Sequence, residues 1–325
     1  MDPFLIGTRK SAMALAQTRE VMDALATAVP GLDVAMHTRE PRGDRDQVSR
    51  LGRHGGKGGA FVAEIRADMA AGRCRAAMHS LKDMPGNEEV PGLVIGAYMP
   101  RDDPADALVL REGVSLRDLE RPGVTIGTNA VRRAAQLARL FPQARIIHYR
   151  GAADTRLAKL DRGAMQALPG GGEVGPADAL VMAVSGLVRI GRADRIARRL
   201  PPDAMPPAAG QGIVAVECGC DDWQAREWLA LIDDAAARAC AEAEREVLWW
   251  LDGHCNSPIA AHATLDGDVL ALRASVLSPD GARVVEAAGE GAADRPRELG
   301  RRVARELVTR GAEAIIAETE PVQTK

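Results

Sequence analysis

The sequence lacks a cysteine framework and long apolar runs. Its five cysteines have no regular spacing and are odd in number, which disfavours disulfides, and six histidines show no metal-ligand spacing. They are Cys74, Cys218, Cys220, Cys240 and Cys255. No apolar stretch approaches the roughly 20 residues of a spanning helix, and none near the N-terminus is long enough for a signal peptide. We therefore expect a cytoplasmic protein that contains no structural metal.

Positive net charge is also absent, and lysine is scarce. The formal net charge is -3, which argues against a generic nucleic-acid binder. Only five of the 42 basic residues are lysines, which leaves 37 arginines. Most of these arginines fit a compositional bias of the surface. Against that background the lysines at positions 57, 82 and 159 stand out, because each lies in a segment discussed below.

A chain of 325 residues predicts two or three domains. In the first two thirds, short apolar runs alternate with helical patterns, which is typical of βαβ units and a largely parallel sheet. The predicted strands are Phe4–Thr8, Leu32–His37, Leu93–Met99, Ala107–Leu110, Val124–Thr128, Ile146–Tyr149, Ala179–Val184 and Ile213–Cys218. The predicted helices are Ser11–Ala28, Phe61–Ala71, Arg132–Leu140, Thr155–Leu160 and Arg192–Leu200.

The last third changes character. A long helix over about 222–251 is expected first, then strands His262–Leu265, Val269–Leu277 and Val284–Ala288, and then a helix Arg295–Arg310. Proline clusters at 99–104 and 200–207 suggest two crossings between domains. The pattern predicts a two-domain clamp, while residues 164–177 form an insertion to which we assign no chemistry.

Two glycine-containing segments could each serve a binding site. Gly7-Thr-Arg-Lys-Ser11 joins a strand to a helix, where Ser11 caps the helix and its N–H groups can face an anion; a plain cap beside a solvated Arg9 is the alternative. Gly55-Gly-Lys-Gly-Gly59 lacks the spacing and the hydroxyl of a nucleotide P-loop. It predicts either a mobile loop that brings Lys57 over a cleft or a disordered connection.

A carboxylate and several arginines are candidates for chemistry. Asp83 lies in His79-Ser-Leu-Lys-Asp-Met-Pro85, where it is either a solvated charge or a cleft carboxylate that stabilises a developing cation. Ligands of open α/β sheets lie beyond the carboxyl ends of strands, so arginines there can converge on one cleft and grip carboxylates. The arginines expected at such ends are Arg132, Arg133, Arg150 and Arg156, with Arg189 farther on.

A turn-rich segment, Leu251-Asp-Gly-His-Cys-Asn-Ser-Pro258, presents Cys255 among small and polar residues. Buried structural cysteines usually lie in apolar runs, as Cys218 does. A loop cysteine beside His254 is a candidate reactive thiol, although an inert exposed cysteine fits equally well.

In this order and over essentially the whole chain, these segments resemble the hydroxymethylbilane synthase family, also called the porphobilinogen deaminases. Further matching segments are Arg101-Asp-Asp-Pro-Ala-Asp-Ala107, Thr155-Arg-Leu-Ala-Lys-Leu-Asp161 and Pro207-Ala-Ala-Gly-Gln-Gly212. Asn129, Ala130 and Ala152 depart from the family pattern, which commonly has hydroxyl or amide side chains there.

The resemblance implies an α/β fold of two domains similar to type II periplasmic binding proteins, joined by two hinge crossings, with a small α+β third domain. The implied boundaries are 1–100 with 211–232, then 104–207, and finally 235–325. It also implies a transferase that deaminates four porphobilinogen molecules, joins them head to tail on a covalent dipyrromethane, and releases the linear tetrapyrrole and ammonia. A monomer whose product passes to the next enzyme of the pathway is expected, without membrane or nucleic-acid partners.

The resemblance further implies a role for each candidate. Cys255 would hold the dipyrromethane through a thioether, and Asp83 would be the catalytic residue that contacts pyrrole N–H groups. The cofactor's carboxylates would be held by Lys82, Thr128, Arg132 and Arg133, and those of the substrate by Arg9, Ser11, Arg150, Arg156 and Arg189. Lys57 would lie on a mobile loop. A non-catalytic anion-binding clamp, such as a solute receptor or sensor, is the alternative.

Overall fold

The computed structural model describes residues 2–40, 62–168, 171–254 and 256–324. Its first unit is built on a five-stranded sheet with the order β2-β1-β3-β12-β4. The strands are β1 (Phe4–Arg9), β2 (Val34–Arg39), β3 (Ala76–Ser80), β4 (Leu93–Tyr98) and β12 (Val214–Gly219). The helices α1 (Ala12–Ala28), α3 (Ala63–Ala70) and α7 (Trp223–Ala230) accompany this sheet, and Leu25, Val216 and Leu229 belong to one buried core.

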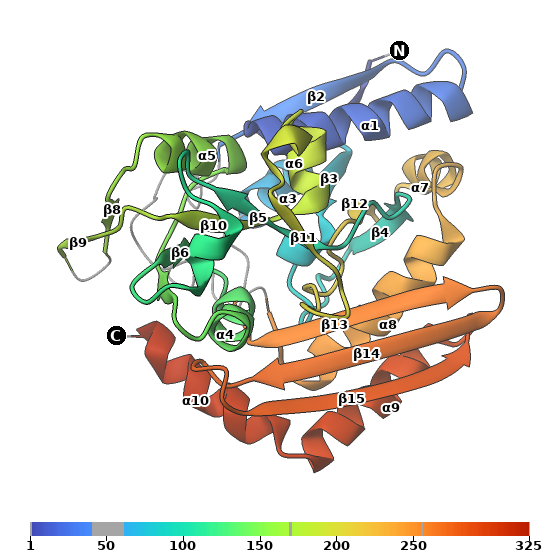
Figure 1. Cartoon of the computed structure of the whole chain (residues 1–325). Helices are drawn as coiled ribbons and strands as arrows, with labels where there is room; N and C mark the ends of the chain where they lie inside the picture. The colour runs from blue at the N-terminus through green and yellow to red at the C-terminus, as the bar shows by residue number, and fades with distance from the viewer. Residues whose placement is uncertain (1, 41–61, 169–170, 255, 325) are drawn as a thin grey trace.

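The second unit has a sheet of its own with the order β11-β5-β10-β6-β7. Its strands are β5 (Asp106–Leu110), β6 (Thr125–Gly127), β7 (Arg145–Ile147), β10 (Ala179–Ala183) and β11 (Arg198–Leu200). The helices are α4 (Val131–Leu140), α5 (Ala153–Asp161) and α6 (Val184–Arg189), with 3-10 turns at Leu116–Glu120 and Ala193–Arg195. Strands β8 (Gln166–Ala167) and β9 (Glu173–Val174) pair with each other within the 164–177 insertion (Figure 1).

The chain crosses between these two sheets twice. It leaves the first sheet after β4 and enters the second at β5, and it returns from β11 to β12. Both crossings coincide with the proline clusters singled out in the sequence. Because β12 re-enters from the other unit, it runs antiparallel to β3 and β4, while β1 pairs in parallel with β2 and β3.

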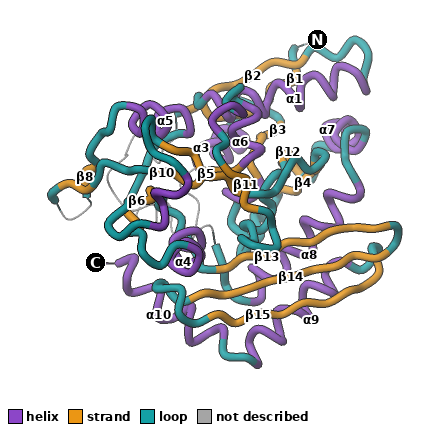
Figure 2. Tube along the Cα trace, viewed as in Figure 1, coloured by secondary structure: helices purple, strands orange, loops and turns teal. Residues whose placement is uncertain are grey.

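The C-terminal unit is a three-stranded antiparallel sheet of β13 (Ile259–Asp266), β14 (Val269–Leu277) and β15 (Val284–Ala292). The helices α8 (Ala235–Trp250) and α9 (Pro296–Thr309) pack against it, and α10 (Ala312–Thr324) ends the chain (Figures 1 and 2). This confirms the expected fold class, two α/β units with a double crossing followed by a small α+β unit.

Most predicted elements are confirmed, and three predictions need correction. The eight predicted strands of the first two thirds exist, with ends within two residues of those expected. The sheets are mixed rather than largely parallel, because returning and edge strands run antiparallel. The predicted helix Arg192–Leu200 is wrong: its second half is β11, whose backbone pairs with the edge of β5. The predicted helix over 222–251 is two helices, because Asp234 caps a new one by accepting from Ala237 N.

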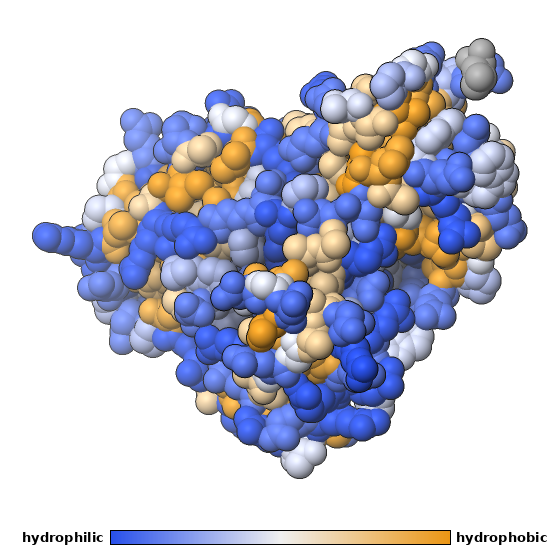
Figure 3. Space-filling view, turned by 90° about the vertical axis from the view of Figure 1, so that its right-hand side faces the viewer, coloured by the Kyte–Doolittle hydropathy of each residue, from blue (hydrophilic) through white to orange (hydrophobic). Residues whose placement is uncertain are grey.

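The elements absent from the sequence prediction include β3, α6, α10 and the short strands β8 and β9. The alanine-rich run of β3 lacks the branched residues that favour strands, and it forms one because it is buried between β1 and β12. No described helix has both the length and the apolar character needed to cross a membrane. On the side shown in Figure 3, hydrophilic side chains dominate and apolar ones form small separate patches.

Candidate functional site

A cavity lies where the three units meet, and basic side chains dominate its wall. Residues from the first unit, from the second unit, from the returning crossing and from the loop after α8 all line it. Seven of the described lining residues are arginine or lysine: Arg9, Lys82, Arg132, Arg133, Arg150, Arg156 and Arg189. Asp83 is the one carboxylate among them. The structure therefore brings the arginines singled out in the sequence to one place, with Asp83 facing them.

Asp83 reaches the cavity from a short 3-10 turn, Leu81–Asp83, directly after β3. Its neighbour Leu81 is buried in the core and fixes this turn, while Asp83 keeps about a third of its side chain exposed. Arg9 at the end of β1 forms an ion pair with it, with Nη1 3.6 Å from Oδ2 of Asp83. A partly exposed carboxylate in a basic cavity can stabilise positive charge that develops on a bound molecule.

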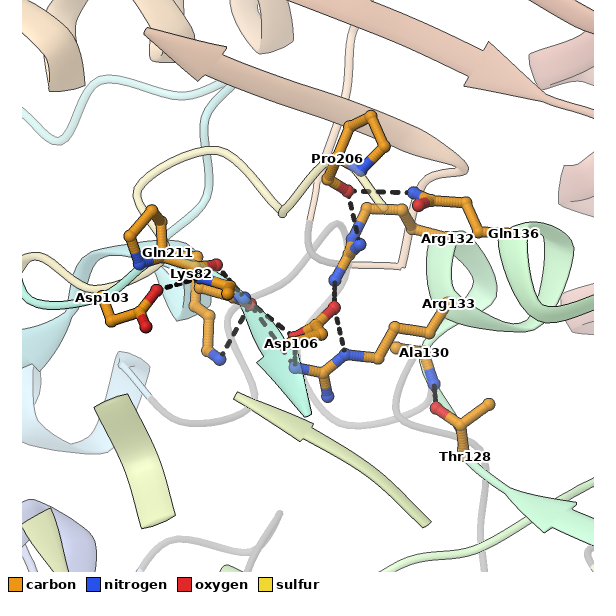
Figure 4. Close-up of polar contacts among 12 residues, drawn as sticks. Lys82, Asp103, Asp106, Thr128, Ala130, Arg132, Arg133, Gln136, Pro206 and Gln211 are labelled. Carbon is orange, nitrogen blue, oxygen red and sulfur yellow. Dashed lines mark hydrogen bonds and ion pairs between the residues drawn. The ribbon is translucent and has the colours of Figure 1, made fainter. Parts of the chain in front are cut away.

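Arg132 and Arg133 begin α4 and share one buried acid, Asp106, at the start of β5. Arg133 donates from Nη2 to Oδ1 over 2.7 Å and from Nε to Oδ2 over 3.1 Å, and Arg132 donates from Nη2 to Oδ2 over 2.9 Å (Figure 4). Burial by itself raises the pKa of Asp106, but the charges of Arg133 and Arg132 outweigh it and hold that pKa well below the usual range. Asp106 is therefore ionised and offsets one of the two positive charges.

Lys82 lies beside Asp83 and contacts the returning crossing. Its Nζ donates to Oε1 of Gln211 over 3.3 Å. Burial, reinforced by repulsion from Arg133, lowers the pKa of Lys82 to about 8. Asp106 and Gln211 were not predicted as site residues, although both lie in segments that carry the family resemblance, and the signal was therefore present.

Arg156, near the start of α5, has a buried Nε that meets no hydrogen-bond acceptor among the described residues. Burial and the neighbouring charge of Arg133 lower the pKa of Arg156 to about 10. A buried N–H donor without an acceptor is energetically unfavourable, and a bound anion would supply the missing acceptor for Arg156 Nε. Arg150, at the other end of this wall, is buried and also lines the cavity.

Two helices begin at the cavity without a side-chain cap. Ala130 precedes α4 and Ala152 precedes α5, and neither makes a side-chain cap hydrogen bond. Both residues line the cavity and are among the departures from the family pattern. The positive ends of these two helices therefore face the same space as the arginines, which favours a bound anion.

The remaining predicted contacts are placed as follows. Ser11 caps α1, accepting from Ala14 N over 3.3 Å, and it also lines the cavity. Thr128 is buried, accepts from Ala130 N over 3.2 Å and is not among the described lining residues. Arg189 reaches the cavity but pairs with Asp102 over 2.7 Å and Glu20 over 3.1 Å.

Cys255 and Lys57 lie outside the described residues. Both chain neighbours of Cys255, His254 and Asn256, line the cavity, as does Ser257. Ser257 Oγ accepts from His254 N over 2.9 Å, and His254 Nδ1 accepts from Asn256 N over 3.2 Å, which fixes the local turn.

The described thiols are poorly suited to nucleophilic chemistry. Burial raises the pKa of Cys74, Cys218 and Cys240 to about 11 in each case. A side-chain hydrogen bond with Asp221 raises the pKa of Cys220. These thiols therefore remain protonated near neutral pH and react slowly.

The chemistry of the wall fits a ligand that carries several carboxylates. Seven cations, two helix starts and an unsatisfied Arg156 donor all favour bound anions, and guanidinium groups match the geometry of a carboxylate. No group of three or more metal-ligating side chains occurs in the described parts of the chain. The donor set thus suits an acidic organic molecule held against a single carboxylate.

Comparisons with known proteins agree with this chemistry. Residues 4–227 match a family model described as porphobilinogen deaminase, dipyromethane cofactor binding domain, and residues 238–309 match one described as porphobilinogen deaminase, C-terminal domain. The porphobilinogen deaminase of Bordetella parapertussis is 40% identical over 321 residues, covering 99% of this chain and 98% of that protein. Those of Xanthomonas axonopodis pv. citri and Roseiflexus sp. are each 41% identical, covering 98% and 96% of this chain and 100% and 98% of their own lengths.

Among solved structures, the methionine-binding protein MetQ is similar with a TM-score of 0.42 and 13% identity, covering 70% of this chain and 88% of its own. Both family models together span most of the residues described above, and the relatives match nearly end to end. The chain belongs to the porphobilinogen deaminase family.

Proposed function

We propose that Asp83 is the catalytic residue of this porphobilinogen deaminase and that Cys255 carries its dipyrromethane cofactor. The activity is that of a hydroxymethylbilane synthase, a transferase that joins four porphobilinogen molecules and releases ammonia. The observation that carries the proposal is one cavity whose described lining residues include seven cations and a single carboxylate, with both neighbours of Cys255 on its wall.

The cations bind and orient the reacting molecules. Each pyrrole unit brings an acetate and a propionate group, so a growing chain needs many fixed positive charges. In the proposed division, Lys82, Arg132 and Arg133 hold the carboxylates of the cofactor, with Thr128 acting from behind through the backbone of Ala130. Substrate carboxylates bind on Arg9, Ser11, Arg150, Arg156 and Arg189, which line the same cavity.

Asp83 acts where charge develops. Loss of ammonia from porphobilinogen leaves a cation delocalised over the pyrrole and its methylene carbon, and a carboxylate that accepts from the pyrrole N–H stabilises it. When bound, the dipyrromethane supplies the pyrrole carbon to which the first substrate is joined. Asp83 would accept the proton that is released where the new carbon–carbon bond forms. After four additions, water releases the linear tetrapyrrole.

The proposed domain boundaries follow the two crossings. Residues 1–100 with 211–232 form the first domain, 104–207 the second, and 235–325 the third; the separate sheets and cores of the three units support this division. Lys57 lies outside the described residues, and its place on a loop stays a prediction. We further propose that the chain acts as a monomer in the cytoplasm and that the next enzyme of the pathway takes up its product.

The intact mass of the denatured protein tests the cofactor assignment. Protein from a host that makes porphobilinogen should carry a covalent dipyrrole adduct, and Cys255→Ser should lack it, whereas Cys220→Ser should keep it as a matched control. An unmodified wild-type chain would contradict the assignment and favour a non-catalytic anion-binding clamp.

A second variant separates catalysis from cofactor binding. Asp83→Asn keeps the size of the side chain but removes the charge, so it should retain the adduct and lose nearly all turnover, measured as ammonia release. Near-normal ammonia release by this variant would refute the catalytic role of Asp83.

A further inference from the structure

We propose that Asp106 and Gln211 are positioning residues, which hold Arg132, Arg133 and Lys82 as one rigid carboxylate-binding face. This inference rests on the proposed function, in which these three cations bind the carboxylates of the cofactor. Asp106 belongs to the first crossing's entry into the second sheet, and Gln211 belongs to the returning crossing.

Asp106 is placed to hold the arginines and not to bind a ligand. Its side chain is fully buried and is not among the described lining residues of the cavity. Four donors occupy its two oxygens: Oδ2 accepts from Arg132 and Arg133, and Oδ1 accepts from Arg133 and from Gln211. With both oxygens occupied, this carboxylate can act on a bound molecule only through the arginines.

The hydrogen bonds leave part of each guanidinium for the cavity. Arg133 uses Nε and Nη2 for Asp106, and its third nitrogen points away from that acid (Figure 4). Arg132 is fixed at a second point, because its Nη1 donates to the carbonyl oxygen of Pro206 over 2.6 Å. Both arginines line the cavity, so their unused N–H groups are held in place before a ligand arrives.

Gln211 joins this pair to Lys82 across the two units. Its Nε2 donates to Oδ1 of Asp106 over 2.8 Å and to the carbonyl oxygen of Pro104 over 2.7 Å. Its Oε1 accepts from Lys82 over 3.3 Å and from Arg133 over 3.4 Å. A glutamate could not donate to these two acceptors and a leucine could do neither, so the amide is the group that this position requires.

Asp106 also reduces the repulsion between the two guanidinium groups. Two guanidinium groups at the start of α4 repel each other and also oppose the helix dipole. One buried carboxylate offsets part of this positive charge and leaves a net positive face for ligand carboxylates. Without it, the guanidinium groups would separate and lose their shared orientation.

The test compares Asp106→Asn and Gln211→Leu with Asp178→Asn. Asp178 also binds an arginine, Arg111, in the same sheet, but it does not line the cavity. We expect Asp106→Asn and Gln211→Leu to lower adduct loading and turnover, each on the order of 10-fold or more, which is the scale of a lost charge-assisted hydrogen bond. Asp178→Asn should lower the melting temperature about as much as Asp106→Asn and Gln211→Leu do. Unlike them, it should retain adduct loading and turnover.

A double-mutant cycle distinguishes positioning from general structural damage. If Asp106 acts partly through Arg133, then Asp106→Asn should lower turnover by a smaller factor in the Arg133→Leu background than in the wild type, because only Arg132 and Gln211 then remain for it to hold. Losses that multiply would overturn the inference, as would wild-type turnover in both Asp106→Asn and Gln211→Leu. Should Arg133→Leu itself leave loading and turnover unchanged, the proposed function of that arginine fails instead.

Discussion

Asn87 donates from Nδ2 to Oδ1 of Asp252 over 2.7 Å, and this bond joins the segment after Asp83 to the loop that contains Cys255. Next to it, Gly86 packs directly against Leu248 of α8. The segment after Asp83 and the proposed cofactor loop therefore contact each other, although they are some 170 residues apart in the chain.

The close approach of Gly86 to α8 predicts that Gly86→Ala destabilises the protein. An added Cβ would lie 2.5 Å from Cβ and from Cδ1 of Leu248, so one of the two segments must move. We expect a loss of about 1–3 kcal/mol in the free energy of unfolding, measured in urea, together with reduced adduct loading. Gly219→Ala is the control, because its nearest neighbouring atom lies at 3.8 Å. Equal stability of the two variants would contradict this prediction, because it would show that Leu248 or the Gly86 segment can move without lowering the free energy of unfolding.

Glu217 and Glu88 both bind Arg66, and their burial predicts very different contributions to stability. Glu217 is 4% exposed and accepts from two nitrogens of Arg66 over 2.9 Å each, whereas Glu88 is 46% exposed. Glu217→Gln should lower the free energy of unfolding by about 3–5 kcal/mol, because it leaves the buried charge of Arg66 without its buried carboxylate. Glu88→Gln should lower it by less than about 1 kcal/mol. Urea unfolding at neutral pH measures both.

The lowered pKa of Glu217 predicts that the stability of the folded protein depends on pH in the acid range. Burial alone raises the pKa of Glu217, but His79 and Arg66 outweigh it and lower that pKa to about 2. A lowered carboxyl pKa stabilises the folded state above the ordinary value near 4.5, and this stabilisation is lost as pH falls from there toward 2. The wild-type protein should therefore lose stability over this range, and Glu217→Gln should show a smaller slope.

The sequence predicted the cations of the candidate site but not the residues that hold them in place. Arg132 and Arg133 could be predicted because they follow a strand end, where ligands of α/β sheets bind. Asp106 could not be assigned to them, since the pairing depends on how β5 and α4 lie in three dimensions and no local spacing encodes it. The segment of Gln211 was singled out in the sequence, but its partners could not be predicted for the same reason, because they lie in other parts of the chain.

Errors in the predicted fold have a similar origin. Residues 76–80 are rich in alanine and favour no strand locally, but burial between two neighbouring strands makes them β3. Arg198–Leu200 becomes a strand through its pairing with β5, which local helix propensity cannot foresee. Tertiary contacts thus decided the structure where local preference was weak, while the strongly patterned α1 and β14 were predicted nearly to their ends.

The lowered pKa of Lys82 predicts weaker substrate or cofactor carboxylate binding in alkaline solution. A lysine is cationic below its pKa, so a pKa of about 8 means that this charge is lost as pH rises through 8. Because Lys82 is proposed to hold the carboxylates of the cofactor, the kcat for ammonia release should fall over that range in the wild-type protein. Lys82→Arg should remove the fall, because an arginine there keeps its charge. Lys10→Arg, an exposed neighbour of the site, should leave the pH profile unchanged.

Arg156 and Arg101 predict opposite effects of the same substitution on stability. Arg101 donates to Glu244, which is fully buried, over 2.6 Å, so Arg101→Leu should cost about 3–5 kcal/mol by leaving that carboxylate without its cation. Arg156 has a buried Nε without an acceptor among the described residues, and burial disfavours its charge. Arg156→Leu should therefore leave the free energy of unfolding unchanged or raise it.

Activity should respond in the other direction. Arg156→Leu should raise the KM for porphobilinogen on the order of 10-fold, because a guanidinium reserved for a ligand carboxylate is lost. Urea unfolding and initial rates of ammonia release, measured on the same preparations, separate the two effects. If Arg156→Leu loses as much stability as Arg101→Leu, then Arg156 has a structural partner, and its unsatisfied donor is not reserved for the substrate.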